Sequence, residues 1–340
     1  MKRWIWLALL VLTMLAVWIN WQRSPSAQSA SPQSGSNKSG SNSQMVQRVR
    51  PAAMPTVDSQ RLLTDLESLT FIRYAETDRA KARRYILRAL QDAGWTAKEM
   101  PFESRVNESG ANSGVNIYAE RVGSEPIAGA ILLGAHYDSV ERSPGADDNA
   151  TSLATVLEAA RLLSASTPRT LKLVFFDLEE VGLLGSQAFI ENPDQQDNLK
   201  GAVILDLVGY ACHEAGCQSY PPVLPITPPT DRGDFLAVIG NQGHPALINS
   251  FTQNTRPTLP QVLTLAIPTF GDFTPDLVRS DHAPFWKKGL GAVLVTDTAN
   301  FRNPHYHQPT DTLETIDQEF FLGSAQVIIN AVTALLQESD

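Results

Sequence analysis

Two adjacent glutamates at the end of a strongly apolar segment are the residues best suited to chemistry. Leu173-Val174-Phe175-Phe176 precedes Asp177-Leu178-Glu179-Glu180. A short apolar run of this kind is typical of a strand buried on both faces of a sheet. Side chains at the carboxyl end of such a strand lie in the crevice where α/β proteins bind ligands. Because neighbouring residues point in different directions, one glutamate is available for a metal and the other for proton transfer. A solvated acidic turn is the alternative.

A histidine follows a second apolar run in the same way. The predicted strand Ala128 to Ala135 leads into His136-Tyr137-Asp138-Ser139. In a His-x-Asp pair the carboxylate can accept the N–H of the ring nitrogen that a metal does not use. This spacing favours a metal ligand over a structural histidine.

Two further acids stand at similar places. Asp147 lies in the segment Pro144 to Ala150, which runs into the predicted helix Leu153 to Leu163, and an acid there could simply cap the helix. Asp206 directly follows the apolar run Gly201 to Leu205. An acid so close to a buried strand is costly unless it is neutralised. Asp206 is therefore the most informative single acid.

Strands and helices alternate along most of the chain, which predicts a three-layer α/β/α sandwich with a mixed, mainly parallel central sheet. The apolar and amphipathic patterns predict strands at 95–102, 115–122, 128–135, 171–180, 201–205, 235–239, 263–270 and 292–297, and helices at 56–69, 76–94, 153–163, around 188–189, 245–251 and 318–336.

In such a sheet the polar residues at the strand ends converge on one edge. Several carboxylates in one partly buried pocket repel one another by several kcal/mol per close pair, as an order of magnitude. They must therefore take up protons or hold a cation. Imidazoles among the acids favour zinc over calcium or magnesium, and the ligands suffice for two ions that share one carboxylate.

These motifs, in this order, resemble the M28 zinc metallopeptidases from about Val57 to the C-terminus. The motifs that carry the resemblance are His136-Tyr137-Asp138-Ser139, Gly145-Ala146-Asp147-Asp148-Asn149, Phe176 to Ser186, Asp206, Ser280-Asp281-His282, and Tyr306-His307 with Asp311-Thr312.

The resemblance implies two zinc ions and a role for each matched residue. One zinc would be held by His136 and Asp206, the other by Glu180 and His307, with Asp147 bridging them. Glu179 would be the general base, Asp138 would orient His136, and Tyr306 would stabilise the oxyanion. His305 is the rival for the last ligand, but its distance to Asp311-Thr312 is wrong by two residues. His282 matches a motif position that is usually not a ligand.

The function implied is a zinc-dependent exopeptidase, an aminopeptidase that uses a water bridging the two ions. A carboxypeptidase-type member and a glutaminyl-peptide cyclotransferase are alternatives. Cyclases carry a longer, Trp-bearing insertion where this chain has only Val181 to Ser186. A membrane-tethered binding ectodomain is the non-enzymatic alternative, but such relatives tend to lose metal ligands, and none is lost here. Arg232 is a candidate for binding a peptide carboxylate.

The N-terminal region predicts export. Lys2 and Arg3 precede an apolar run from Trp4 to Trp21, which is near the minimum length for spanning a bilayer. We expect a signal anchor or signal peptide at 1–23, a disordered Ser/Gly-rich linker at 24–45, and a peptidase domain at 46–340. The anchored, extracytoplasmic form is favoured over a secreted or periplasmic form released by cleavage.

Charge and cysteine content add two expectations. The formal net charge of −9 argues against a nucleic-acid partner, which requires a basic face. The only two cysteines, Cys212 and Cys217, are close together in an exported chain, which favours a disulfide. A metal site formed by this pair and His213 lacks a fourth ligand and is the weaker reading.

Overall fold

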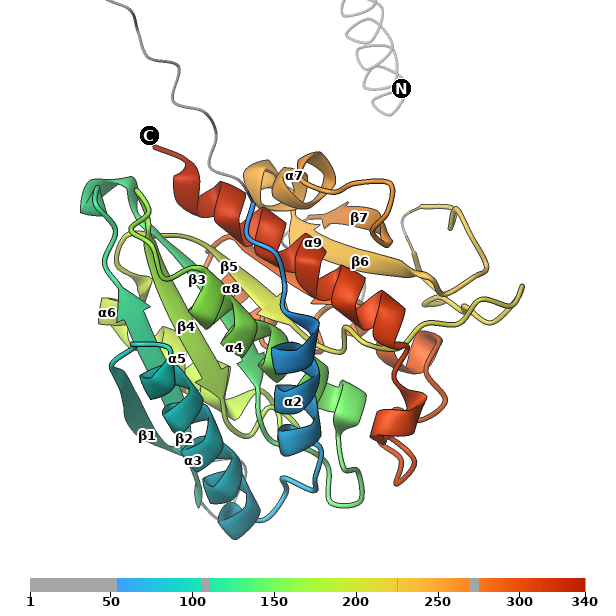
Figure 1. Cartoon of the computed structure of the whole chain (residues 1–340), viewed down its shortest axis with the longest axis horizontal. Coiled ribbons are helices and arrows are strands. Elements are labelled where there is room, and N and C mark those ends of the chain that lie inside the picture. Colours follow the sequence, from blue (N-terminus) through green and yellow to red (C-terminus); the bar gives the residue numbers. More distant parts are fainter. Residues whose placement is uncertain (1–53, 106–110, 225, 269–274, 340) are drawn as a thin grey trace, which may run out of the picture. The chain divides into compact units, whose positions relative to one another are not determined.

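The body of the chain is built around one eight-stranded sheet (Figure 1). The computed structural model describes residues 54–105, 111–224, 226–268 and 275–339. The predicted anchor and linker lie outside these residues. The strands are β1 (Ala97–Arg105), β2 (Ala111–Arg121), β3 (Ala130–His136), β4 (Thr170–Phe176), β5 (Leu199–Leu205), β6 (Phe235–Asn241), β7 (Gln261–Ile267) and β8 (Ala292–Thr296).

The sheet is mixed and mainly parallel, as predicted. Its order is β1-β2-β4-β3-β5-β8-β6-β7. The four central strands, β4, β3, β5 and β8, are mutually parallel. At one end β1 and β2 form an antiparallel pair, and at the other β6 runs antiparallel to β8 and parallel to β7. The central strands β3 and β4 are buried along their whole length, which explains their nearly continuous apolar sequence.

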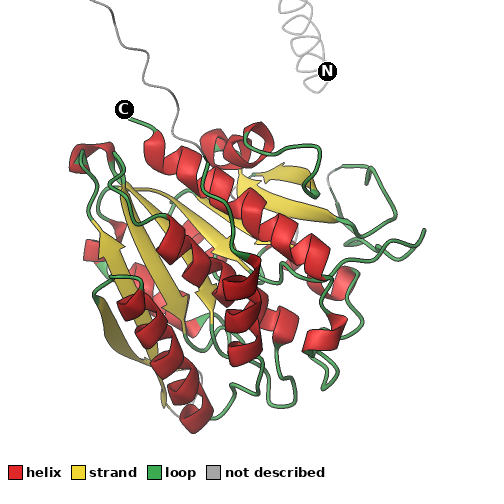
Figure 2. Ribbon diagram, viewed as in Figure 1, coloured by secondary structure: helices red, strands yellow, loops and turns green. Residues whose placement is uncertain are grey.

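Helices cover both faces of the sheet (Figure 2). Alternate strand residues face two separate cores, so that Leu133 belongs to one and Leu132 to the other. The larger core is formed with α2 (Ser59–Leu69), α3 (Glu76–Asp92), α4 (Ser152–Leu162), α7 (Pro245–Gln253) and α9 (Gln318–Gln337), and the smaller one with α5 (Leu184–Glu191) and α8 (Ala283–Lys287). The short helix α6 (Pro193–Gln196) follows α5.

The helix ends agree with the capping residues in the sequence. Asp58 accepts a hydrogen bond from the backbone N–H of Arg61 at the start of α2, and Asp317 does the same for Phe320 at the start of α9. Among the described helices, α9 alone has the length and apolar character needed to cross a membrane, and 72% of its most apolar window is buried in the protein. We therefore assign α9 to the protein core.

Candidate metal centre and active site

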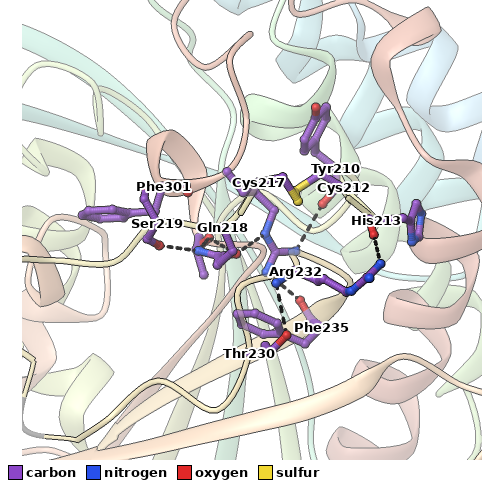
Figure 3. Close-up of a disulfide and its surroundings, with 12 residues drawn as sticks. Tyr210, Cys212, His213, Cys217, Gln218, Ser219, Thr230, Arg232, Phe235 and Phe301 are labelled. Atoms are coloured by element: carbon purple, nitrogen blue, oxygen red, sulfur yellow. Dashed lines mark hydrogen bonds between the residues drawn. A yellow bond between two sulfur atoms is a disulfide. The ribbon is translucent and has the colours of Figure 1, made fainter. Parts of the chain in front are cut away.

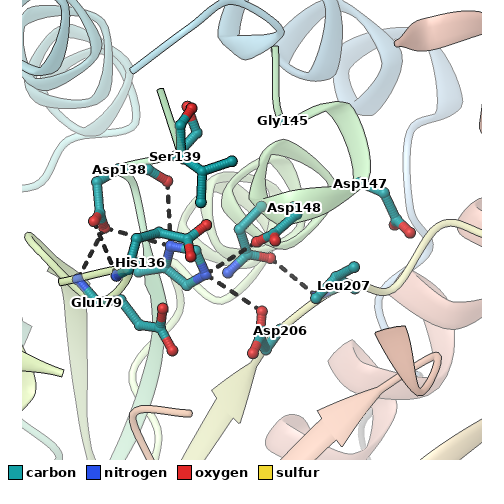
Figure 4. A network of polar contacts seen from close by, with 12 residues as sticks. His136, Asp138, Ser139, Gly145, Asp147, Asp148, Glu179, Asp206 and Leu207 are labelled. Carbon is teal, nitrogen blue, oxygen red and sulfur yellow. Dashed lines mark hydrogen bonds and ion pairs between the residues drawn. The ribbon is translucent and has the colours of Figure 1, made fainter. Parts of the chain in front are cut away.

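Three neighbouring strands bring the first ligand candidates together. His136 is the last residue of β3, Glu179 and Glu180 follow β4, and Asp206 follows β5. Because β3 pairs in parallel with both β4 and β5, these residues share one edge of the sheet. His136 Nε2 lies 3.3 Å from an oxygen of Asp206 and 3.3 Å from an oxygen of Asp148 (Figure 4).

A second imidazole approaches the same acid from the loop before α9. His307 Nε2 lies 3.1 Å from the other oxygen of Asp148 and 3.0 Å from an oxygen of Glu180. The carboxylate of Asp148 therefore lies between the two imidazoles, one oxygen toward each.

The structure differs from the sequence-based expectation at Asp147. One Asp147 oxygen accepts the backbone N–H of Gly209 at 2.9 Å, and the other accepts the amide of Asn303 at 2.8 Å. Both oxygens of the Asp147 carboxylate are thus engaged in hydrogen bonds within the protein. The carboxylate of Asp148 instead faces His136 and His307. Adjacent residues point in different directions, and the position between the imidazoles belongs to Asp148.

Asp138 links His136 to the two glutamates. Its carboxylate accepts the backbone N–H groups of Glu179 and Glu180, each at 3.1 Å, and lies 3.4 Å from His136 Nδ1. The backbone carbonyl of Asp138 is 3.2 Å from the same ring nitrogen. With Nδ1 engaged in this way, Nε2 is directed toward Asp148 and Asp206 (Figure 4).

The donor atoms form two overlapping groups. In the first, atoms of His136, Glu179 and Asp206 all lie within 4.8 Å of one another, and in the second those of His136, Asp148 and Glu180 do. Glu179 is 8% exposed, whereas an oxygen of Glu180 lies 3.0 Å from His307 Nε2.

The buried acids of this cluster need protons or cations to neutralise them. Burial raises the pKa of Glu179 well above its ordinary value, and the charges of Asp206 and Glu180 raise it further. Burial, together with the charge of Asp148, raises the pKa of Glu180 to about 7. Burial alone would lower the pKa of His307, but its contacts with Asp148 and Glu180 raise it to about 10. The acids thus hold a proton on His307.

Divalent metal ions fit this donor set. Among the buried polar atoms of the described residues, one oxygen of Asp148, one of Glu180 and Nε2 of His307 lack a hydrogen-bond partner. Carboxylate oxygens and imidazole nitrogens in one pocket are the ligands that zinc prefers. The positive charge of a metal ion would replace the protons that otherwise neutralise these acids.

The remaining histidines lie away from these donors. His282 is buried, with Nε2 2.9 Å from the carbonyl of Leu277 and its ring against Trp286. Burial lowers its pKa to about 4. His305 contacts the hydroxyl of Thr310 at 2.9 Å. His213 is exposed and pairs with Asp317, and His244 is half-buried just before α7.

Tyr306 lies against the candidate ligand His307. The two rings stack with centroids 3.8 Å apart and planes 20° apart. The Tyr306 hydroxyl accepts a hydrogen bond from Arg279 Nη2 at 3.1 Å. Burial and the charges of the nearby acids raise the pKa of this hydroxyl, so it remains a proton donor at neutral pH.

Sequence reasoning missed Arg73, which fixes the segment that carries Asp148. This arginine is fully buried and donates to the backbone carbonyls of Tyr137 at 2.8 Å, Pro144 at 2.9 Å and Gly145 at 3.0 Å. Asp311 acts on the same segment by accepting the backbone N–H groups of Asp147 and Asp148. Asp311 belongs to the motif Asp311-Thr312, but no spacing in the sequence distinguishes Arg73 from other arginines.

Cys212 and Cys217 form a disulfide (Figure 3). The alternative metal site at these cysteines is thereby excluded. The bridge lies at the start of a long loop between β5 and β6, which is held further by Arg302. Arg302 donates from Nε to the Gln218 side chain at 2.9 Å and from Nη2 to the carbonyl of Phe235 at 2.9 Å. A disulfide is typical of proteins that reside in an oxidising compartment outside the cytoplasm.

A cavity of about 590 Å³ opens directly onto the candidate metal centre. The loop between β5 and β6 supplies one wall, including Tyr220 and Leu224. The floor comes from β6, β7 and β8, through Phe235, Ile239, Leu263, Leu265 and Leu294. Arg232, the expected carboxylate contact, donates instead to the carbonyl of His213 and is absent from the described lining.

Fold and site together define an α/β/α protein with a carboxylate–imidazole centre at the carboxyl edge of its sheet, and such a centre suits metal-assisted hydrolysis. The chain belongs to peptidase family M28, whose model matches residues 116–332. Its substrates are therefore peptides.

Two sequence relatives are similar over much of the chain. An uncharacterized protein, YfbL, from Escherichia coli strain K12 is 35% identical over 224 residues, which cover 60% of this chain and 66% of that protein. Leucine aminopeptidase 1 from Arthroderma otae is 26% identical over 319 residues, which cover 84% of this chain and 76% of that protein.

Two solved structures share the fold. BSAP, a zinc aminopeptidase from Bacillus subtilis, superimposes with a TM-score of 0.66 at 15% identity, covering 84% of this chain and 97% of that one. The glutaminyl cyclase from Porphyromonas gingivalis superimposes with a TM-score of 0.61 at 18% identity, covering 82% of this chain and 99% of that one.

Proposed function

We propose that this protein is a zinc-dependent aminopeptidase with two metal ions. The position of Asp148 carries the proposal, because its two oxygens separately face His136 and His307. In this arrangement His136 and Asp206 would hold one ion, Glu180 and His307 the other, and Asp148 would join them. Zinc bound there would polarise the scissile carbonyl and make a water acidic enough to attack at neutral pH.

The residues around the metals perform the proton transfers. Glu179 takes a proton from the attacking water and delivers it to the departing amine. Its burial and raised pKa suit this task, because both make the carboxylate a better proton acceptor than an exposed one. The Tyr306 hydroxyl donates a hydrogen bond to the oxygen of the substrate carbonyl as negative charge develops there.

The aminopeptidase assignment is supported by Arthroderma otae leucine aminopeptidase 1, which aligns over most of the chain. The cyclase alternative shares the fold, but the segment from Val181 to Ser186 is short here and contains no tryptophan. We further propose that residues 1–23 anchor the enzyme to a membrane with residues 46–340 outside the cytoplasm. The disulfide supports the extracytoplasmic part of this proposal.

Replacing Glu179 by Gln tests the proposed base. We expect Glu179→Gln to retain zinc and to lower kcat for leucine p-nitroanilide about 10²–10⁴-fold, because an amide cannot accept the proton. Metal content by mass spectrometry and initial rates measure the two effects. Glu141→Gln is the matched control, because Glu141 is exposed on the segment after β3 and should keep full activity. Full activity of Glu179→Gln would place the base elsewhere.

A substrate panel tests the reaction class. An aminopeptidase cleaves leucine p-nitroanilide and free peptides, whereas a carboxypeptidase cleaves N-blocked peptides and a cyclase converts glutaminyl peptides. A chelator should abolish the activity, and zinc should restore it. Turnover of only the blocked or only the glutaminyl substrates would overturn the aminopeptidase assignment.

A further inference from the structure

Arg279 is a cation in the wall of the substrate cavity that the mechanism above does not use. It lines the same cavity as the candidate ligands His136 and His307. Its side chain is 44% exposed. Nη2 donates to the Tyr306 hydroxyl at 3.1 Å, and Nη1 donates to the Asn300 side chain at 3.0 Å.

The guanidinium retains unused hydrogen-bonding capacity. Arginine carries five N–H donors, and among the described residues only Tyr306 and Asn300 accept hydrogen bonds from Arg279. Among the residues that the structure describes, the carboxylate paired with Arg279 is that of Asp276, which lies 3.8 Å away and is itself partly exposed. This separation is too long for a bidentate pair, so the positive charge is only partly compensated.

Arg279 is placed to bind a substrate group that lies close to the bond being cleaved. Its guanidinium carbon lies 5.9 Å from the centre of the Tyr306 ring, which in turn stacks at 3.8 Å on the ring of His307. The carboxylate of a peptide's final residue lies about one to two residue lengths, roughly 3.5–7 Å, beyond the bond cleaved in a di- or tripeptide. Because Arg279 lines the same cavity beside Tyr306, the carboxylate of a short peptide bound at the metal centre is the substrate group that we expect it to meet.

We propose that Arg279 binds the C-terminal carboxylate of di- and tripeptides and so makes this enzyme selective for short peptides. The inference depends on the proposed aminopeptidase function and assigns a substrate class to that site. Arginine suits this task, because its planar guanidinium pairs with a carboxylate through two parallel hydrogen bonds. The apolar floor formed by residues such as Phe235 and Leu263 accommodates the side chains of the same peptide.

Leu-Leu and Leu-Leu-amide test this, because they differ only in the terminal carboxylate. We expect the wild-type enzyme to have a kcat/KM at least about 10-fold higher for the acid than for the amide. Arg279→Gln should lower kcat/KM for the acid about 10- to 100-fold, mainly through KM, and leave the amide within about 3-fold. Arg279→Lys should give an intermediate ratio, because it keeps the charge but not the paired hydrogen bonds.

The controls separate carboxylate binding from other roles. Lys287, another cation in the described lining, is the matched control, and Lys287→Gln should leave the acid-to-amide ratio unchanged. If Arg279→Gln slows both substrates equally, Arg279 only positions Tyr306 and the proposal is wrong. Equal wild-type rates for acid and amide also overturn it, while leaving the aminopeptidase assignment intact. If the enzyme cleaves none of Leu-Leu, Leu-Leu-amide and leucine p-nitroanilide, both the role of Arg279 and the aminopeptidase assignment are wrong.

Discussion

Asp147 and Asp148 are chemically identical neighbours with different surroundings. The backbone N–H of Gly209 and the amide of Asn303 bind the Asp147 carboxylate, and burial near Asp297 raises its pKa well above the ordinary value. Burial would also raise the pKa of Asp148, but contacts with His136 and His307 lower it below the ordinary value. One acid is therefore held as a structural hydrogen-bonding group and the other as an anion available to cations.

Substituting each acid by asparagine separates these roles. We expect Asp148→Asn to reduce bound zinc from about two ions to one or fewer, and to lower kcat/KM at least about 10³-fold, because the shared anionic ligand is lost. Asp147→Asn should retain both ions. Zinc-to-protein ratios and rates of leucine p-nitroanilide hydrolysis give the answer. Metal loss in Asp147→Asn but not in Asp148→Asn would restore Asp147 as the shared ligand.

Residue types and spacings predict which side chains meet, but not how each one points. The strand-end pattern correctly placed His136, Asp138, Glu179 and Asp206 at one edge of the sheet. It did not distinguish the two adjacent acids, because that choice depends on the path of the backbone before α4. Arg73 was not predictable, since its burial depends on carbonyl groups that lie far from it in the sequence.

At the scale of secondary-structure elements, the strands that the sequence predicts well are those buried on both faces. The predicted strands 128–135, 201–205 and 292–297 correspond to β3, β5 and β8, because strands covered on both faces have nearly continuous apolar sequences. The long loop between β5 and β6 had no predictable structure. It is fixed by tertiary contacts, including a backbone bridge between Cys212 and Gly233 and the side chain of Arg302.

The disulfide should contribute measurably to stability at this loop. Cys212 and Cys217 are five positions apart, and closing so short a loop reduces the entropy of the unfolded chain. We expect the double variant Cys212→Ser, Cys217→Ser to lose about 2 kcal/mol of unfolding free energy. Urea unfolding at a fixed zinc concentration measures this loss.

Reductant provides the control for this prediction. It should lower the urea midpoint of the wild type to that of the double serine variant and leave the variant itself unchanged. A wild-type midpoint insensitive both to reductant and to the substitutions would show that Arg302 and the backbone bridge suffice to hold the loop.

At the scale of the whole molecule, the alternation of strands and helices was enough to predict the α/β/α class. It did not predict the strand order or the antiparallel pairing of β6 with β8. The strand order and this pairing depend on the direction in which the chain crosses the sheet after the loop of residues 206–234. No local sequence pattern predicts that direction. The gathering of His136, Glu179 and Asp206, by contrast, follows from the parallel direction of β3, β4 and β5, since parallel neighbours end at the same edge.

The same concentration of charge makes the stability of the whole fold depend on pH and metal together. Without metal, burial raises the pKa of Glu180 to about 7 from an ordinary 4.5, and that of Asp311 to about 6 from 3.8. An acid with a raised folded pKa contributes most stability when protonated, so its contribution falls as pH rises from about 4 to 7. His307, raised to about 10 from 6.5, loses its contribution over the higher range from 6.5 to 10. All three effects weaken the metal-free fold as pH rises.

Zinc should reverse this trend, because its ligands bind only when deprotonated, so its affinity rises with pH. Ligand binding to the folded state stabilises it in proportion to RT ln(1 + [L]/Kd). We therefore expect the difference in Tm between zinc-loaded and chelator-treated protein to be small at pH 5 and large at pH 8, with the metal-free Tm itself decreasing over that range. Calorimetric scans at matched ionic strength measure both quantities. Asp148→Asn should show a smaller zinc effect at pH 8, whereas a pH-independent zinc effect in the wild type would mean that these acids are not the ligands.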